Sequence, residues 1–337
     1  MAEITRRQFV GAAGLTMASA AALKASAQNA PLTPTQRARD LTEEELQAMF
    51  DRCSNTGKWG PDDELGTLNY ITAKKRIAAA ALVKSGEVVS VGRDLNTKQT
   101  KTNPRPLDLH MFYSAPSGVS RTDYFSIASH GMTVTHMDAL VHFSVDGKLY
   151  NGRDVAQTFS GNGAKWGSVF AQKNGIFTKG VLLDVAAARG VEWYKPDEYV
   201  TVADFEAAEA RQKVKVQSGD AIFVRTGMEV MEAKQGEQDV YPRAGLHAEC
   251  VEWMHKREVS VYGGDCIEKL PYPSKRFTSA MHMIGLVSMG LPILDWPSLT
   301  ELAQTCERLK RWDYLLTTAP LRIPGATATP VNPLCLF

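Results

Sequence analysis

The chain has 337 residues, of which 44% are hydrophobic and 22% charged, and its formal net charge is +1. This composition is typical of a globular protein with a large core, and it excludes a disordered chain or a repeat array. Because the charge is so close to zero, there is no basic field that would attract nucleic acid or an anionic membrane.

The first 27 residues predict an export signal. The pair Arg6-Arg7 precedes a short run of Ala, Gly and Leu that is too brief to span a bilayer, and Ala25-Ser26-Ala27 is a small-residue cleavage site. We predict a twin-arginine signal peptide over residues 1–27, export of the folded chain and a periplasmic mature protein with no membrane attachment. The alternative, an amphipathic terminal anchor, is disfavoured because the run has no polar face. Loss of this segment removes three cations and one acid, so the charge falls from +1 to about −1.

The mature chain divides into an extension and one larger domain. Residues 28–58 predict a helical extension, in which Thr42 starts a helix with a capping box and Leu46 and Met49 supply its apolar face. Residues 59–337 predict a single domain, since no linker marks a further boundary.

Two long apolar runs predict the fold class. The runs at 180–185 and 219–227 suit strands that are covered on both faces, and residues 201–214 between them predict a helix capped by Thr201 and Asp204. A strand, a helix and a second strand with short links predict a crossover in a mixed or parallel sheet. The fold class is therefore α/β, with a mixed β-sheet core and flanking helices. Shorter strands are expected at 88–93, 107–113, 124–129 and 259–262.

The five cysteines are widely and irregularly spaced. Their number is odd, and they form neither a disulfide framework nor a zinc motif. A chain of this length does not need disulfide bonds for stability. One disulfide bond, formed in the periplasm, is an alternative that the sequence leaves open.

The segment from His130 to His142, HGMTVTHMDALVH, holds three of the seven histidines and one aspartate. His136 and Asp138 are two residues apart and project to the same side of an extended chain, whereas Asp138 and His142 share a face only in a helix. We therefore expect a strand or loop that becomes a helix near Asp138. Imidazole and carboxylate ligands suit zinc, and also manganese or iron. The alternative is a buried histidine cluster or a solvated turn without a metal.

The residues THMDALVHFSVDGKLYNG resemble the signature of the cyclase family of metal-dependent hydrolases, which includes bacterial kynurenine formamidase and isatin hydrolase. The family motif reads H-x-G-T-H-x-D-x-x-x-H, and Thr135, His136, Asp138 and His142 match it in place. The resemblance extends over roughly residues 59–333, including Arg225-Thr226-Gly227 and the ending APLRIPGATATPVNP. It implies the β/β/α arrangement of that family.

The resemblance also implies roles for individual residues. His136 and Asp138 would bind a divalent metal ion, zinc or manganese, and His142 would be the catalytic acid and base. The first motif histidine falls on Met132, and the motif glycine falls on Val134. His130, two residues before Met132, keeps its side chain on the same face of a strand and could replace the missing ligand.

The second half of the implied metal site lies far along the chain. In the family, a histidine that opens a helix and an acid that ends the following strand complete the metal centre. These positions correspond to His282 and Asp295, although the acid is usually Glu. The alternative makes His282 an ordinary helix residue and Asp295 the N-cap of a helix over residues 298–308.

The function that the resemblance implies is metal-dependent hydrolysis of a formamide, another amide, a cyclic amide or a lactone. The enzyme would be of the arylformamidase type, acting on C–N bonds other than peptide bonds of a small-molecule substrate, as in tryptophan catabolism, and relatives suggest a homodimer. Two alternatives stay open. One is a periplasmic binding protein that has lost the metal, and the other is a cyclase or dehydratase that uses the same pocket.

Overall fold

A computed structural model describes residues 38–113 and 118–337. The predicted signal peptide at residues 1–27 and the start of the predicted extension lie outside this range. Within the described ranges, no helix combines the length and the apolar character needed to cross a bilayer. All five cysteines are buried and none forms a disulfide bond.

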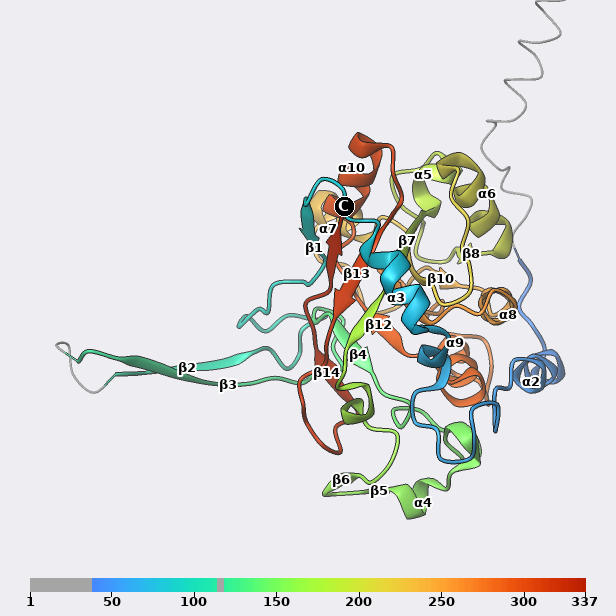
Figure 1. Cartoon of the computed structure of the whole chain (residues 1–337), viewed down its shortest axis with the longest axis horizontal. Helices are drawn as coiled ribbons and strands as arrows, with labels where there is room; N and C mark the ends of the chain where they lie inside the picture. Colours follow the sequence, from blue (N-terminus) through green and yellow to red (C-terminus); the bar gives the residue numbers. More distant parts are fainter. Residues whose placement is uncertain (1–37, 114–117) are drawn as a thin grey trace, which may run out of the picture. The chain divides into compact units, whose positions relative to one another are not determined.

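A nine-stranded mixed sheet organises the described chain (Figure 1). In order across the sheet, its strands are β1 (Val88–Ser90), β15 (Leu334–Leu336), β13 (Asp313–Thr318), β7 (Ile176–Asp184), β9 (Ala221–Arg225), β11 (Val261–Gly264), β12 (Ile293–Asp295), β4 (His136–Asp138) and β14 (Ala328–Pro330). The four strands β7, β9, β11 and β12 are parallel to one another. The remaining pairs are antiparallel. The predicted α/β fold with a mixed sheet is therefore confirmed.

Helices and short strands surround this sheet. The α-helices are α2 (Glu43–Arg52), α3 (Ala73–Ala80), α4 (Val155–Thr158), α5 (Val185–Arg189), α6 (Val202–Gln212), α7 (Met228–Gln235), α8 (Glu249–Lys256), α9 (Ala280–His282) and α10 (Thr300–Leu309). The other helical segments are η2 (Gly66–Tyr70), η3 (Tyr150–Gly152), η4 (Val169–Gln172) and the π-helix η5 (Met283–Met289). The described chain also forms three two-stranded sheets: β2 (Asp108–Tyr113) with β3 (Arg121–Ser126), β5 (Phe159–Ser160) with β6 (Gly163–Ala164), and β8 (Tyr199–Val200) with β10 (Gly245–Leu246).

The central strands are buried on both faces, which explains their unbroken apolar sequence. In β7, Val181 and Leu183 pack in one hydrophobic core together with residues of α2, α6 and α8. Leu182 points to the opposite face and packs in a second core with residues of α10. Successive side chains of a strand alternate between faces in this way. The predicted strand, helix and strand are therefore β7, α6 and β9, and β7 and β9 are parallel as expected.

Two predicted helix starts are confirmed, because both depend only on nearby residues. Thr42 and Glu45 form a reciprocal capping box at the start of α2, and Thr201 and Asp204 form another at the start of α6. Such boxes satisfy backbone N–H groups that have no partner within the helix. Leu46 of α2, within the predicted extension, packs in the same core as β7.

The two segments predicted as strands before His130 pair with each other outside the large sheet. They form the hairpin β2–β3, in which Leu109 lies opposite Phe125 and Phe112 opposite Thr122. Figure 1 shows the hairpin extending beyond the sheet. Several of its apolar side chains are exposed, including those of Met111, Phe112 and Phe125. The hairpin thus contributes little to either core.

Asp265 joins the end of β11 to the start of α7. One carboxylate oxygen accepts hydrogen bonds from the backbone N–H and the hydroxyl of Thr226. The other oxygen accepts from the backbone N–H groups of Gly227 and Met228. Burial raises the pKa of Asp265, and the Thr226 bonds oppose this shift. Its role is structural, since four donors in the interior depend on it.

We predict that Asp265→Ala lowers the free energy of unfolding by about 3 kcal/mol, because buried donors would lose their acceptor. Urea denaturation of the purified chain measures this loss. Asp62→Ala is the control, since Asp62 forms an exposed ion pair with Arg153, and it should change the free energy by less than about 0.5 kcal/mol. Equal effects of the two substitutions would contradict the structural role of Asp265.

Candidate metal centre

Strand β4 places two side chains of the motif in the interior of the protein. His136 and Asp138 are two residues apart on this strand and therefore project to the same face. Their exposed fractions are only 2% and 0%. Since β4 lies between β12 and β14, the backbone that carries both side chains is held on two sides.

The pairing of β4 with β12 brings in a third residue. In the antiparallel register, His136 lies directly opposite Asp295. Side chains at directly opposed positions of two strands are neighbours on one face of the sheet. The Oδ2 atom of Asp295 lies 3.7 Å from Nε2 of His136. Two segments that are far apart in the sequence thus form one cluster.

A turn, and not the predicted helix, follows Asp138. The backbone N–H groups of Ala139 and Val141 donate to Thr327 and Gly167, and so are not available for a helical ladder. The N–H of His142 donates back to the carbonyl of Ala139 and closes the turn. This turn brings Nε2 of His142 to 3.9 Å from Oδ1 of Asp138. The expectation of a helix was wrong, but the two side chains do meet.

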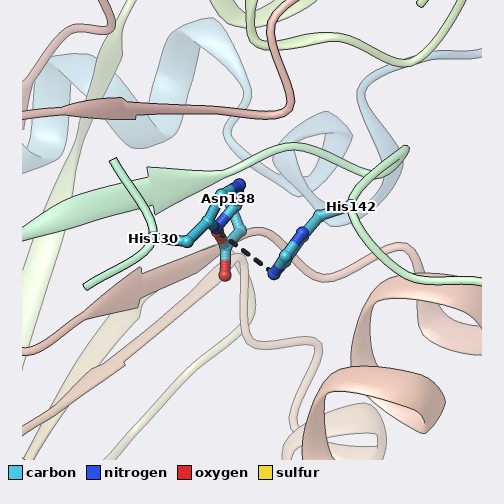
Figure 2. Close-up of side chains that lie close together, drawn as sticks. All are labelled: His130, Asp138 and His142. Atoms are coloured by element: carbon cyan, nitrogen blue, oxygen red, sulfur yellow. Dashed lines mark ion pairs between the residues drawn. The ribbon is translucent and has the colours of Figure 1, made fainter. Parts of the chain in front are cut away.

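His130 approaches the same carboxylate from the segment before β4. Its Nδ1 atom lies 3.1 Å from Oδ1 of Asp138, and its ring stacks on that of His142 with centroids 3.8 Å apart. The Nε2 atom lies 2.9 Å from the hydroxyl of Thr327. Figure 2 shows how His130, Asp138 and His142 point toward one another.

His282, the last residue of α9, completes the cluster from the other half of the chain. Its Nε2 atom lies 3.7 Å from Oδ2 of Asp138 and 3.5 Å from Oδ2 of Asp295. The structure therefore brings together all six residues that the sequence singled out. These are His130, His136, Asp138, His142, His282 and Asp295.

Glu268, which was not among the predicted site residues, holds His282 in place. Both carboxylate oxygens of Glu268 lie 2.9 Å from Nδ1 of His282, and one of them also accepts the backbone N–H of His282. Glu268 is 4% exposed and lies in the segment between β11 and α9. With Nδ1–H donated to Glu268, the Nε2 atom of His282 faces the cluster. No local pattern around Glu268 indicates this role.

The alternative role of Asp295 as a helix cap is wrong. The helix α10 begins at Thr300, and the carboxylate of Glu229 accepts the backbone N–H groups of Leu299 and Thr300. Glu229 also accepts the hydroxyl of Thr300. Because α7 supplies the cap, Asp295 is left to face His136 and His282.

Three buried carboxylate oxygens of the cluster accept no hydrogen bond in the described chain. Both oxygens of Asp138 and Oδ1 of Asp295 are buried without an aligned hydrogen-bond donor. The Nδ1 atom of His136 lies 2.8 Å from the carbonyl oxygen of Val134. Since a carbonyl can only accept, Nδ1 carries the ring proton and donates a hydrogen bond to it. In the neutral ring, the lone pair of Nε2 then points at carboxylate oxygens. Such an arrangement costs free energy unless a cation lies among these atoms.

The spacing of the atoms also fits a metal ion. The Nε2 atom of His136 lies 3.5 Å from Oδ1 of Asp138, which is too long for a good hydrogen bond. Two ligands about 2.1 Å from one tetrahedral ion are roughly 3.4 Å apart. Two groups of donor atoms could hold an ion, and they share Asp138: His130, Asp138 and His142, and His136, Asp138 and Asp295. Imidazole and carboxylate donors suit a divalent ion.

Burial and mutual charge shift the pKa values of the cluster. Burial alone would raise the pKa of Asp138, but the surrounding imidazoles, with His136 first, hold it well below its usual range. Burial lowers the pKa of His142 to about 3, although Asp138 opposes this shift. Burial would also lower the pKa of His282, but Glu268 and Asp295 outweigh it and raise that pKa. Burial and the nearby Asp138 raise the pKa of Asp295. Asp138 is therefore ionised and His142 neutral at neutral pH.

Comparison with protein families assigns the chain. The model of the Cyclase family, described as "Putative cyclase", matches residues 82–268, more than half of the chain. The chain belongs to the cyclase family. The matched region includes the whole segment from His130 to His142 and ends at Glu268, so the predicted resemblance is confirmed.

Solved structures share the fold of this chain. A crystal structure described as a novel cyclase has a TM-score of 0.75 and 28% sequence identity, and the match covers 84% of this chain and 99% of that chain. Isatin hydrolase A from Ralstonia solanacearum has a TM-score of 0.53 and 20% identity, covering 78% and 96% of the two chains. An isatin hydrolase bound to the product analogue thioisatinate has a TM-score of 0.52 and 15% identity, covering 79% and 99%. No curated protein matches the chain.

We predict that Glu268→Gln lowers the affinity for zinc by about 10- to 100-fold, because His282 would lose a charged partner that fixes its ring and raises its basicity. Competition with a chromophoric chelator measures this affinity. Glu252→Gln is the matched control, since Glu252 pairs with Arg52 and Lys256 on the outside of α8, and it should leave the affinity unchanged. An unchanged affinity in Glu268→Gln would show that Glu268 does not support a ligand.

Proposed function

We propose that this cyclase-family chain is a metal-dependent hydrolase that acts on a formamide, another amide, a cyclic amide or a lactone. The activity would be of the arylformamidase type, on C–N bonds other than peptide bonds. One observation carries the proposal: the buried carboxylate of Asp138 has no aligned donor, although four imidazoles surround it. We propose zinc or manganese as the ion and His130, His136, Asp138, His282 and Asp295 as candidate ligands.

A divalent ion held by these residues would supply Lewis-acid chemistry, which makes water a better nucleophile near neutral pH and polarises a carbonyl oxygen. The protein keeps the donors in place without help from the ion. The carbonyl of Val134 fixes the ring of His136, and Glu268 fixes the ring of His282. Little reorganisation is then needed at the moment of reaction, which favours catalysis.

His142 is the proposed acid and base. Its lowered pKa leaves the imidazole neutral, so that it can accept a proton from the attacking water and return it to the leaving group. Its side chain is 22% exposed, whereas that of His136 is 3% exposed. A substrate could therefore reach His142 more easily than His136. The stacked ring of His130 restricts the orientation of His142.

The comparisons support the reaction class only through the fold. The neighbours named as isatin hydrolases share 20% and 15% identity with the chain, and hydrolysis is what their names state. Met132 stands where the family motif has a histidine, and this departure favours the alternative of a binding protein without a metal. The position of His130 beside Asp138 favours the hydrolase, since it supplies an imidazole from a neighbouring position.

Metal content distinguishes a metal-dependent hydrolase from a binding protein without a metal. Protein purified without chelator should hold near-stoichiometric zinc or manganese by elemental analysis, because a site of this kind binds tightly. Removal of the ion should abolish turnover of a panel of aryl formamides and lactones, and restoring it should restore turnover. A chain without metal that still binds these compounds would instead be a binding protein. Product analysis distinguishes hydrolysis from elimination or ring closure.

We predict that His142→Ala lowers kcat by at least about 100-fold on the same panel, because general acid and base catalysis would be lost. Steady-state kinetics measure the change, and elemental analysis should show that the metal is retained. His110→Ala on the exposed hairpin is the control and should leave kcat unchanged. Retained turnover in His142→Ala would remove this residue from the mechanism.

We also propose that the mature chain is a periplasmic homodimer exported by the twin-arginine route. The pair Arg6-Arg7 and the cleavage site before residue 28 support export. The exposed apolar side chains of β2–β3 support the dimer, since a lone two-stranded hairpin is marginally stable in water. Cell fractionation and light scattering of the mature chain test the two parts.

A further inference from the structure

A pocket of about 150 Å³ lies beside the candidate metal centre. His130 belongs to both sites, because it lines the pocket while its Nδ1 atom lies 3.1 Å from Asp138. The other walls come from the loop 101–105, from residues between 128 and 134, and from Val240. A molecule in the pocket would therefore contact His130, a candidate ligand of the proposed metal ion.

The loop 101–105 is fastened to the protein by specific contacts. The backbone N–H and the hydroxyl of Thr102 both donate to the same oxygen of Glu237 at 2.8 Å. The side-chain amide of Asn103 donates to the backbone carbonyls of Asn96 and Lys98. Thr102 and Asn103 are 7% and 5% exposed. These contacts hold the loop in place as one wall of the pocket.

The charges of the pocket are unbalanced. None of the residues that line it is acidic. Of its two basic side chains, Lys101 forms an ion pair with Asp239 at 2.9 Å. Arg105 has no ion-pair or hydrogen-bond partner among residues 38–113 and 118–337. Its guanidinium is therefore available to an anion, and the planar group matches a carboxylate with two parallel hydrogen bonds.

The rest of the pocket is largely apolar. Met132, Val134 and Val240 supply aliphatic surface to its lining. A cavity of about 150 Å³ is large enough for one aromatic ring. Met132 occupies the position at which the family motif has a histidine, so the departure from the motif places an apolar side chain in the pocket lining.

We propose that Arg105 binds a carboxylate of the substrate, and that a single ring or short chain of the same substrate packs against Met132 and Val134. The substrate class is then a carboxylate-bearing amide, formamide or lactone. This inference rests on the proposed function, because it takes the reaction to occur at the neighbouring cluster. The pocket orients the scissile carbonyl by holding the opposite end of the substrate.

Two substrates that differ only in a carboxylate test the proposal. We expect Arg105→Gln to raise KM for 4-formamidobenzoate by about tenfold, with little change in kcat, because a charge-assisted contact is lost. The KM for formanilide, which has no carboxylate, should stay unchanged. Lys98→Gln is the matched control: it removes one positive charge from an exposed position of the same segment, outside the pocket lining, and should change neither KM.

Binding without turnover separates this inference from the proposed function. Benzoate is titrated into chelator-treated mature protein and followed by NMR, so that no metal competes for the carboxylate. The wild-type chain should bind benzoate at least about fivefold more tightly than Arg105→Gln. Equal binding, or an equal rise in KM for both substrates, would overturn the role of Arg105. If the wild-type chain hydrolyses neither compound but shows the expected difference in benzoate binding, the arylformamidase activity fails and the carboxylate site stands.

Discussion

The buried carboxylate of Asp138 is the constraint on which the rest of the site depends. It is fully enclosed, its pKa is held low by imidazoles, and neither oxygen has an aligned donor in the described chain. An ionised carboxylate in this condition is costly unless a positive charge lies beside it. The sheet keeps it there nonetheless, because β4 is held between β12 and β14. The fold thus supports a local arrangement that is unfavourable without a cation.

The supporting groups differ in how rigidly they are held. His136 and Asp295 are opposed residues of two paired strands, so the sheet sets their separation. His282 lies in a short helical segment, and its direction depends on Glu268. His142 lies on a turn and remains partly exposed. Donors held on strands and by buried partners suit the binding of an ion, and a side chain on a turn suits contact with a substrate.

Chemistry and selectivity are divided between separate elements in the arrangement that we propose. The cluster is built on β4, β12 and α9, whereas Arg105 belongs to a loop fastened by Glu237. Loops tolerate change better than paired strands. A chain of this family could therefore alter its substrate through the loop while keeping the cluster. Met132 stands where the family motif has a histidine, and it lines the pocket. In this arrangement it therefore contributes to selectivity.

The sequence by itself determined the features that depend on neighbouring residues. The capping boxes at Thr42 and Thr201 join groups three residues apart, and the apolar runs of β7 and β9 predict the parallel crossover. The density of histidines from His130 to His142 also indicated one cluster, and the motif indicated the family.

Tertiary structure decided everything that depends on distant pairing. The helix expected after Asp138 is a turn, because its N–H groups bond to Gly167 and Thr327 from other segments. Asp295 faces the cluster and does not cap α10, because Glu229 of α7 takes that role. The function of Glu268 exists only where its segment meets α9. In each case the hydrogen-bond partner lies far along the chain, and the local sequence therefore does not predict it.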